Sequence, residues 1–134
     1  MAHNTVMSET AVNAQADQLA QLANNGFIRI YDGDQPASSD DPITDQNQLC
    51  ELLLGSPAFA PASGGTIQAN PITADPDADN TGDASWFRVF ESDGVTALWD
   101  GSVGTSNCDI NINSVSIQQH ANVSLTAFSH TVAK

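Results

Sequence analysis

Four aspartates in one short, turn-rich segment are the residues best suited by type and spacing to bind a metal ion. They are Asp75, Asp77, Asp79 and Asp83. Carboxylates that alternate along a turn can converge on a hard cation such as calcium. The spacing begins like an EF-hand loop, but Asn80 stands where that loop needs glycine and Trp86 where it needs glutamate. A solvated acidic loop is therefore the favoured interpretation of this segment, and calcium binding is the alternative. We predict no other metal and no cofactor.

The three histidines form no recognisable catalytic pattern. They are His3, His120 and His130, and no two of them have the spacing of a zinc-binding helix. An activated serine needs a partnered histidine and an acid, and the sequence contains no Gly-x-Ser-x-Gly motif. His120 is interpreted as an ordinary surface residue, and a catalytic carboxylate pair has no local support. We predict that the chain is not an enzyme.

Two arginines lie in strand-like runs in which they alternate with aromatic residues. Arg29 does so within 27–31 and Arg88 within 86–90. An ion pair with a carboxylate of the same chain is the first interpretation. A face that contacts another chain is the second, because arginine and aromatic residues are enriched at interfaces. For the second interpretation the contact candidates are Arg29, Tyr31, Trp86, Arg88 and Phe90, together with His3 and Asn4 near the N-terminus.

The charge balance limits the classes of partner. Three basic residues stand against 16 acidic ones in a chain of 134 residues, which gives a net charge of -13. A protein with so few cations cannot displace counterions from phosphate, so we expect no nucleic-acid partner and no anionic membrane surface. A cation-rich protein surface is the positive inference, and solubility alone is the alternative.

No segment of the sequence reads as a membrane span or a signal peptide. The longest apolar run, at 49–54, is interrupted by Glu51 and is too short to cross a bilayer. Residues 1–10 have neither a basic nor an apolar segment, so we expect synthesis in the cytoplasm. Cys50 and Cys108 are read as small hydrophobic residues, and a disulfide between them is the less favoured alternative.

The stretch 85–101 gives the strongest fold signal. Two runs rich in aromatic and β-branched residues meet at Asp93-Gly94, a dipeptide that tolerates the positive φ angles of a tight turn. The sequence therefore predicts a β-hairpin. Its face with Trp86, Arg88 and Phe90 opposes the expected core face, so it needs a cover: the N-terminal helix, a second sheet or a partner.

The remaining pattern predicts one domain, 1–134, with three parts. Residues 1–7 are polar and are expected to form a flexible arm, and residues 8–25 a helix with Ser8 as N-cap, an apolar stripe of Val12, Ala16, Leu19 and Ala23, and a stop at Asn24-Asn25-Gly26. Residues 27–133 are expected to form an antiparallel, jelly-roll-like β-sandwich of about seven or eight strands. The further strands are expected at 27–31, 49–54, 66–70, 109–113 and 122–132, and the acidic stretches 34–48 and 75–83 are expected to be loops.

The ordered elements resemble a group of small tailed-phage virion proteins. The residues that carry the resemblance are Asn24-Asn25-Gly26, Ile28 to Tyr31 with Asp32-Gly33, Gln35-Pro36-Ala37, Leu52 to Leu54, Ala58-Phe59-Ala60, Ala62 to Gly65, Thr81-Gly82, Trp86-Phe87-Arg88, Asp93-Gly94, Asp100 to Gly104, Asp109 to Ile112, and Val123 to Phe128. The resemblance implies a structural protein of the virion and carries no catalytic residues.

Three functions are compatible with this resemblance. A capsid decoration (cement) protein is expected first: it would bind the major capsid protein at the outer capsid surface as a dimer or trimer. A tail or head-to-tail component is the alternative, and a virion-associated hydrolase is third.

Overall fold

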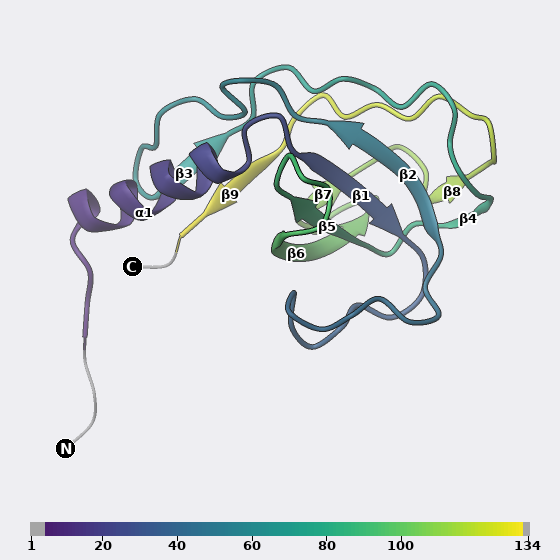
Figure 1. The fold of residues 1–134 in the computed structure, drawn as a ribbon, viewed down its shortest axis with the longest axis horizontal. Helices are drawn as coiled ribbons and strands as arrows, with labels where there is room; N and C mark the ends of the chain where they lie inside the picture. Colours follow the sequence, from purple (N-terminus) through teal and green to yellow (C-terminus); the bar gives the residue numbers. More distant parts are fainter. Residues whose placement is uncertain (1–4, 133–134) are drawn as a thin grey trace.

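The computed structural model describes residues 5–132, which form one helix and nine strands. The helix is α1 (Glu9–Leu22), and the strands are β1 (Phe27–Tyr31), β2 (Gln48–Leu53), β3 (Thr66–Gln68), β4 (Gly82–Asp83), β5 (Trp86–Phe90), β6 (Ala97–Gly104), β7 (Ile110–Asn111), β8 (Ser116–Ile117) and β9 (Ser129–Thr131). The prediction of a mainly β protein with one N-terminal helix is confirmed (Figure 1).

The largest sheet has the strand order β2-β1-β5-β6-β7. All its pairs are antiparallel except β6 with β7. One face of this sheet carries apolar side chains that are fully buried, among them Ile28 and Ile30 of β1 and Val89 of β5. Ile28 is opposite Val89 and Ile30 is opposite Phe87, and the two-residue period of a strand places all four on one face. The predicted core face of β1 is confirmed.

The predicted hairpin is present as β5 and β6, and its loop is longer than two residues. Glu91 N–H donates to the carbonyl of Thr96, which closes the loop. The Asp93 carboxylate accepts hydrogen bonds from the amides of Val95 and Thr96 and from the Thr96 hydroxyl. Gly94 has φ +71, so the positive φ expected of the Asp-Gly turn occurs at the glycine.

Helix α1 begins after the predicted N-cap Ser8 and ends at Leu22, before the predicted stop at Asn24-Asn25-Gly26 and short of the expected limit at residue 25. The Ser8 side chain accepts a hydrogen bond from Ala11 N–H as N-cap, and Asn25 takes a left-handed φ of 58 just after the helix. The buried stripe differs at one position from the expected one: Ala20 is buried and Leu19 is only partly so.

Three polar side chains of α1 and its C-terminal extension hold the segment 57–66 against the helix. Asn13 accepts from Gly65 N–H at 2.7 Å, and Asp17 accepts from Ala62 N–H at 2.8 Å. Asn24 accepts from Ala58 N–H at 2.8 Å. Side chains four residues apart lie on one helix face, so this face binds main-chain donors that no strand partner satisfies.

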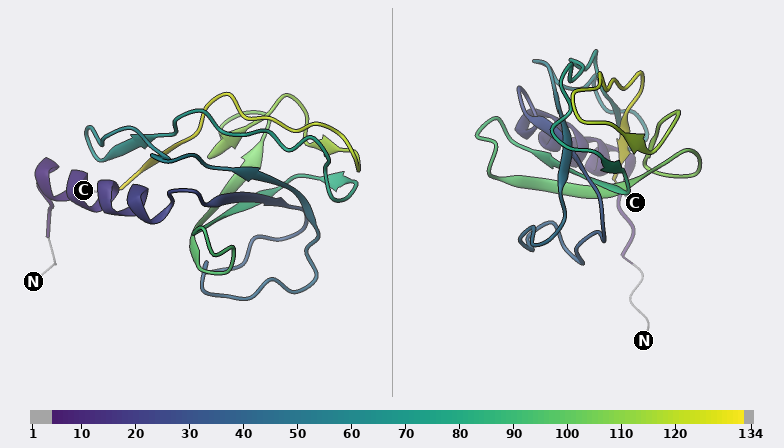
Figure 2. Two further views of the ribbon diagram at one scale, coloured as in Figure 1. Left: turned by 45° about the horizontal axis from the view of Figure 1, so that its top comes forward. Right: turned by 90° about the vertical axis from the view of Figure 1, so that its right-hand side faces the viewer.

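The second layer over the core face contains short strands joined by long irregular segments (Figure 2, left). Phe128, just before β9, makes an edge-to-face contact with Phe87 of β5, with ring centroids 5.4 Å apart. The expected strand 122–132 is wrong in extent: only β9 and a single β-bridge at Val123 pair. The expected loop 75–83 contains β4, which pairs with β8. The structure therefore has nine strands within residues 5–132 instead of the expected seven or eight, and it arranges them as one five-stranded sheet and two small sheets.

Candidate functional site

The two arginines lie in one row of charged side chains that crosses four strands. Glu51 of β2 is opposite Arg29 of β1, Arg29 is opposite Arg88 of β5, and Arg88 is opposite Asp100 of β6. Like charges directly opposite each other are destabilising. Here each arginine has a carboxylate on its other side, and these two carboxylates offset the repulsion between the arginines.

The two ion pairs of this row differ in burial. Arg29 Nε lies 2.6 Å from Glu51 Oε2, and both side chains are partly exposed. Arg88 binds Asp100 through two nitrogens, Nε at 2.7 Å and Nη2 at 2.9 Å, and both side chains are at least 95% buried. The hydrogen bonds that Arg88 donates to the Asp100 carboxylate, together with the negative charge of that carboxylate, raise the pKa of Arg88. The interpretation of the arginines as partners of carboxylates within the chain is confirmed.

Aromatic rings surround the row on the same face of the sheet. Tyr31 and Trp86 stack with ring centroids 4.5 Å apart. The Arg29 guanidinium lies 4.5 Å from the centre of the Phe90 ring, and that of Arg88 lies 5.4 Å from the centre of the Trp86 ring. Both distances are within the range of a cation–π contact.

The loop between β1 and β2 covers this face (Figure 2, left). Trp86 Nε1 donates to the carbonyl of Asp32, and Arg88 donates to the carbonyls of Ser38 and Asp41. The helix, a second sheet or a partner was expected to cover this face. The long acidic loop covers it instead, and we call this segment the cover loop (residues 32–47).

This cover corrects the proposed contact surface. Tyr31, Trp86, Arg88 and Phe90 are each at most 5% exposed, so they contact their own chain rather than a partner. The sequence predicted a loop at 34–48 but not that it covers this face, because the loop binds Trp86 and Arg88 through main-chain carbonyls, which any residue type supplies. Arg29 is the one described candidate that keeps partial exposure, and His3 and Asn4 lie outside the described residues.

The four aspartates of the calcium hypothesis point to different partners. Asp75 accepts from Glu51 N–H and Asp77 N–H, and Asp79 accepts from the Gln48 side chain. Asp83 lies in β4. Among residues 5–132, no group of three or more acidic, histidine or cysteine side chains is arranged to hold a metal ion.

The two described histidines, His120 and His130, have different surroundings. His120 is exposed, as predicted, and its Nδ1 lies 2.6 Å from Asp77 Oδ1. His130 of β9 packs on the Trp99 ring at 4.6 Å, and burial lowers its pKa. Within the described chain the side-chain partner of His120 is a carboxylate, and neither His120 nor His130 has a hydrogen bond to a serine or cysteine.

Both cysteines are free thiols. Cys50 is fully buried in β2, and burial raises its pKa to about 12. Cys108 is partly exposed, between β6 and β7. The buried thiol therefore behaves as a small apolar residue at neutral pH.

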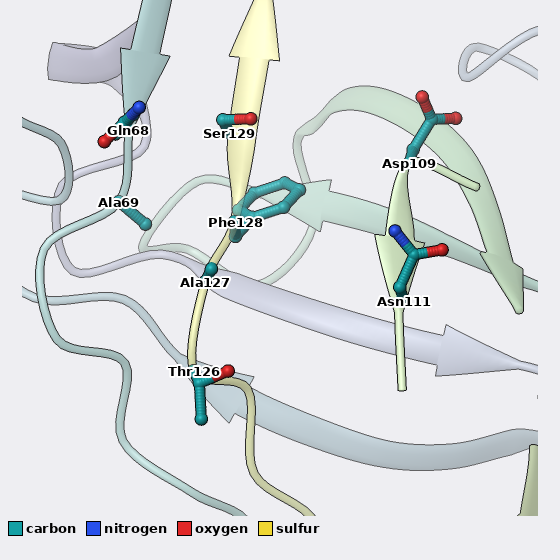
Figure 3. A pocket seen from close by; sticks show the side chains of 8 residues that line it. All are labelled: Gln68, Ala69, Asp109, Asn111, Thr126, Ala127, Phe128 and Ser129. Atoms are coloured by element: carbon teal, nitrogen blue, oxygen red, sulfur yellow. The ribbon is translucent and has the colours of Figure 1, made fainter. Parts of the chain in front are cut away.

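A cleft lies between β9 and β7 (Figure 3). Its volume is about 390 Å³. Gln68 and Ala69 line one side, the segment 126–129 the middle, and Asp109 and Asn111 the other side. No sequence motif marks this cleft, because it is made by two short strands that are separated by 17 residues and do not pair.

The surface of the described chain is acidic without compensating basic groups. Both arginines are bound to carboxylates. The exposed acidic residues are Glu9, Asp17, Asp34, Asp40, Asp41, Asp45, Asp77, Asp79, Asp83, Asp93 and Asp109. In the part of the chain described, no helix has the length and apolarity needed to cross a membrane.

Comparison with protein-family models, with curated proteins and with solved structures found no match.

Proposed function

We propose that the chain is a capsid decoration protein of a tailed bacteriophage, which binds the outer surface of the major capsid shell and stabilises it. One observation carries the proposal: both described arginines are used inside the chain, while eleven acidic side chains are exposed. Such a surface repels DNA and attracts a cation-rich protein surface. The resemblance of the sequence to small virion proteins supports the choice of a capsid as that surface.

The fold is compatible with this role. The packing of Phe128 on Phe87 joins two layers, and we keep the jelly-roll-like sandwich as the architecture that this packing favours. Residues 5–8 precede α1, carry no charge and include Val6, which is 78% exposed. We propose that this segment contacts the shell, since many weak contacts repeated over a capsid give strong overall attachment.

The test is binding of the purified protein to phage shells that lack it. Co-sedimentation gives the bound fraction, and a map of the particle gives the location. We expect binding to the shell on the order of hundreds of copies, as repeated sites require. Deletion of residues 1–7 is expected to weaken binding without changing the circular dichroism spectrum.

A matched pair of variants tests the charge argument. Asp34→Asn with Asp40→Asn removes two exposed charges whose carboxylates accept no hydrogen bond within the described chain, and Gln35→Ala is the control in the same loop. We expect weaker binding for the first variant only. A copy number equal to a small multiple of three or six would place the protein in the tail or the head-to-tail junction and overturn the proposal.

A further inference from the structure

The cleft of Figure 3 is bounded by two strand edges that lack a partner strand. β7 is the last strand of the five-stranded sheet, and β9 pairs only with β3. An unpaired edge presents main-chain donors and acceptors that can bind a further strand.

The hydrogen bonds of β9 show which of its groups face the cleft. Ala69 N–H donates to the carbonyl of Phe128, and Val132 N–H donates to the carbonyl of Gly65. Antiparallel ladder bonds fall on alternate residues, so the main-chain groups of Ser129 point away from β3.

The same reasoning applies to β7. Ile112 N–H donates to the carbonyl of Gly104 on β6, and Asn111 is the residue paired with Gly104. In a parallel ladder the main-chain groups of the paired residue on β7 then point away from β6. Asn111 and Ser129 both line the cleft, so two strand edges whose main-chain groups point away from their own sheets border one space.

We propose that this cleft binds an extended segment from a second copy of the chain, namely residues 1–8, which would add a strand between β7 and β9. The added strand would join the two sheets into one continuous ladder. The cleft volume of about 390 Å³ is many times the roughly 15 Å³ that a single water needs, so the cleft has room for a few extended residues.

Charge and shape favour this occupant. Residues 1–8 contain no acidic side chain, whereas 16 acidic residues lie in the rest of the chain, and Asp109 is at the rim of the cleft. Val6 is 78% exposed, and Ser8 has the extended dihedral angles φ -73 and ψ 160. Figures 1 and 2 show residues 5–8 leading away from the body, so they are placed to reach a neighbouring molecule.

The association is expected to be weak for isolated molecules. β7 has two residues and β9 has three, so an inserted strand makes only a few hydrogen bonds. Small interfaces of this kind are typical of transient complexes. The inference concerns the same N-terminal segment as the capsid proposal, but its test uses the isolated protein, so the failure of one proposal is distinguishable from the failure of the other.

The test uses sedimentation velocity over a wide range of protein concentration. We expect the wild-type protein to associate as its concentration rises, and Val6→Asp and the deletion of residues 1–7 to stay monomeric. Ser129→Pro removes the N–H that faces the cleft and should prevent association, whereas Ser129→Ala keeps that N–H and should associate like the wild type.

A second measurement keeps the proposal falsifiable if Ser129→Pro fails to fold. A synthetic peptide of residues 1–8 is added to the isotope-labelled protein that lacks residues 1–7, and amide resonances are followed. We expect the signals of Ser129 and Asn111 to shift, and a peptide with Val6→Asp to shift them less. Unchanged signals, a wild type that is monomeric at every concentration, or equal association without residues 1–7 would each overturn the inference.

Discussion

Arg88 and Arg29 occupy neighbouring positions of one row, but replacing them is expected to lower the free energy of unfolding by different amounts. Arg88→Met leaves the Asp100 carboxylate, 95% buried, without its partner and releases the cover loop from two hydrogen bonds. Loss of one partner of a buried pair costs about 3–5 kcal/mol. Arg29→Met breaks a partly exposed pair, which is worth about 1 kcal/mol or less.

Urea unfolding of the two variants checks this prediction, and the double variant Arg88→Met with Asp100→Leu sharpens it. We expect the double variant to recover part of the lost free energy of unfolding, because no unpaired charge stays buried. Equal destabilisation by Arg29→Met and Arg88→Met would contradict the role given to burial.

His130 is predicted to make the protein less stable at mildly acidic pH. Burial lowers its pKa below the ordinary value of 6.5. The unfolded chain therefore binds a proton at a higher pH than the folded one does, so stability is complete above pH 6.5 and falls as the pH drops towards the folded pKa. His130→Phe keeps a ring against Trp99 but cannot titrate.

The measurement for His130 is the free energy of unfolding between pH 7.5 and 5.5. We expect a smaller decrease for His130→Phe than for the wild type. His120→Gln, which removes an exposed histidine, is the matched control. A decrease of the same size in wild type and His130→Phe would show that other groups cause the pH dependence.

At the scale of elements, the docking of α1 depends on polar side chains as well as on its apolar stripe. Asn13→Ala removes the acceptor of Gly65 N–H, and the loss of one such hydrogen bond costs about 1 kcal/mol. Gln18→Ala, on the exposed side of the same helix, should change stability by less than about 0.5 kcal/mol.

Hydrogen exchange provides a second readout for the helix. We expect faster exchange at Gly65 and its neighbours in Asn13→Ala, with the amides of β5 unchanged, because the variant frees one segment and leaves the main sheet intact. Uniform acceleration in both places would instead mean that the whole domain is destabilised.

Elements with strong local signals were predictable, and elements defined by distant partners were not. α1 follows from its cap, stripe and stop signals, and β1 and β5 follow from their alternation and from Asp93-Gly94. β4 has only two residues and pairs with β8 across 32 intervening residues, so no local pattern reveals it. The alternation at 122–132 predicted a long strand, but only Ser129–Thr131 form one, and Val123 pairs with Asp75 in a single bridge.

The candidate site shows the same limit. The alternation of arginine and aromatic residues correctly marked one face of the sheet, but exposure depends on the cover loop. That loop reaches Arg88 through the carbonyls of Ser38 and Asp41, and main-chain acceptors leave no trace in residue type. The cleft between β7 and β9 has no sequence signal for a related reason: it consists of groups that remain unpaired.

At the scale of the whole molecule, the net charge of -13 predicts that added salt stabilises the fold. Only two ion pairs with arginine exist among the described residues, so repulsion between exposed carboxylates outweighs attraction. Two such charges about 10 Å apart repel by roughly 0.4 kcal/mol in water, and 0.1 M salt screens most of this because the Debye length is then about 10 Å.

Urea unfolding in increasing sodium chloride should give a higher midpoint with an unchanged slope, and most of the gain should occur below about 0.3 M, where screening acts. Sodium sulfate at matched ionic strength separates screening from the exclusion of salt from the protein surface, which continues to grow at high concentration. A midpoint that falls with sodium chloride would mean that the row of Glu51, Arg29, Arg88 and Asp100 dominates the electrostatics, contrary to the count of unpaired carboxylates.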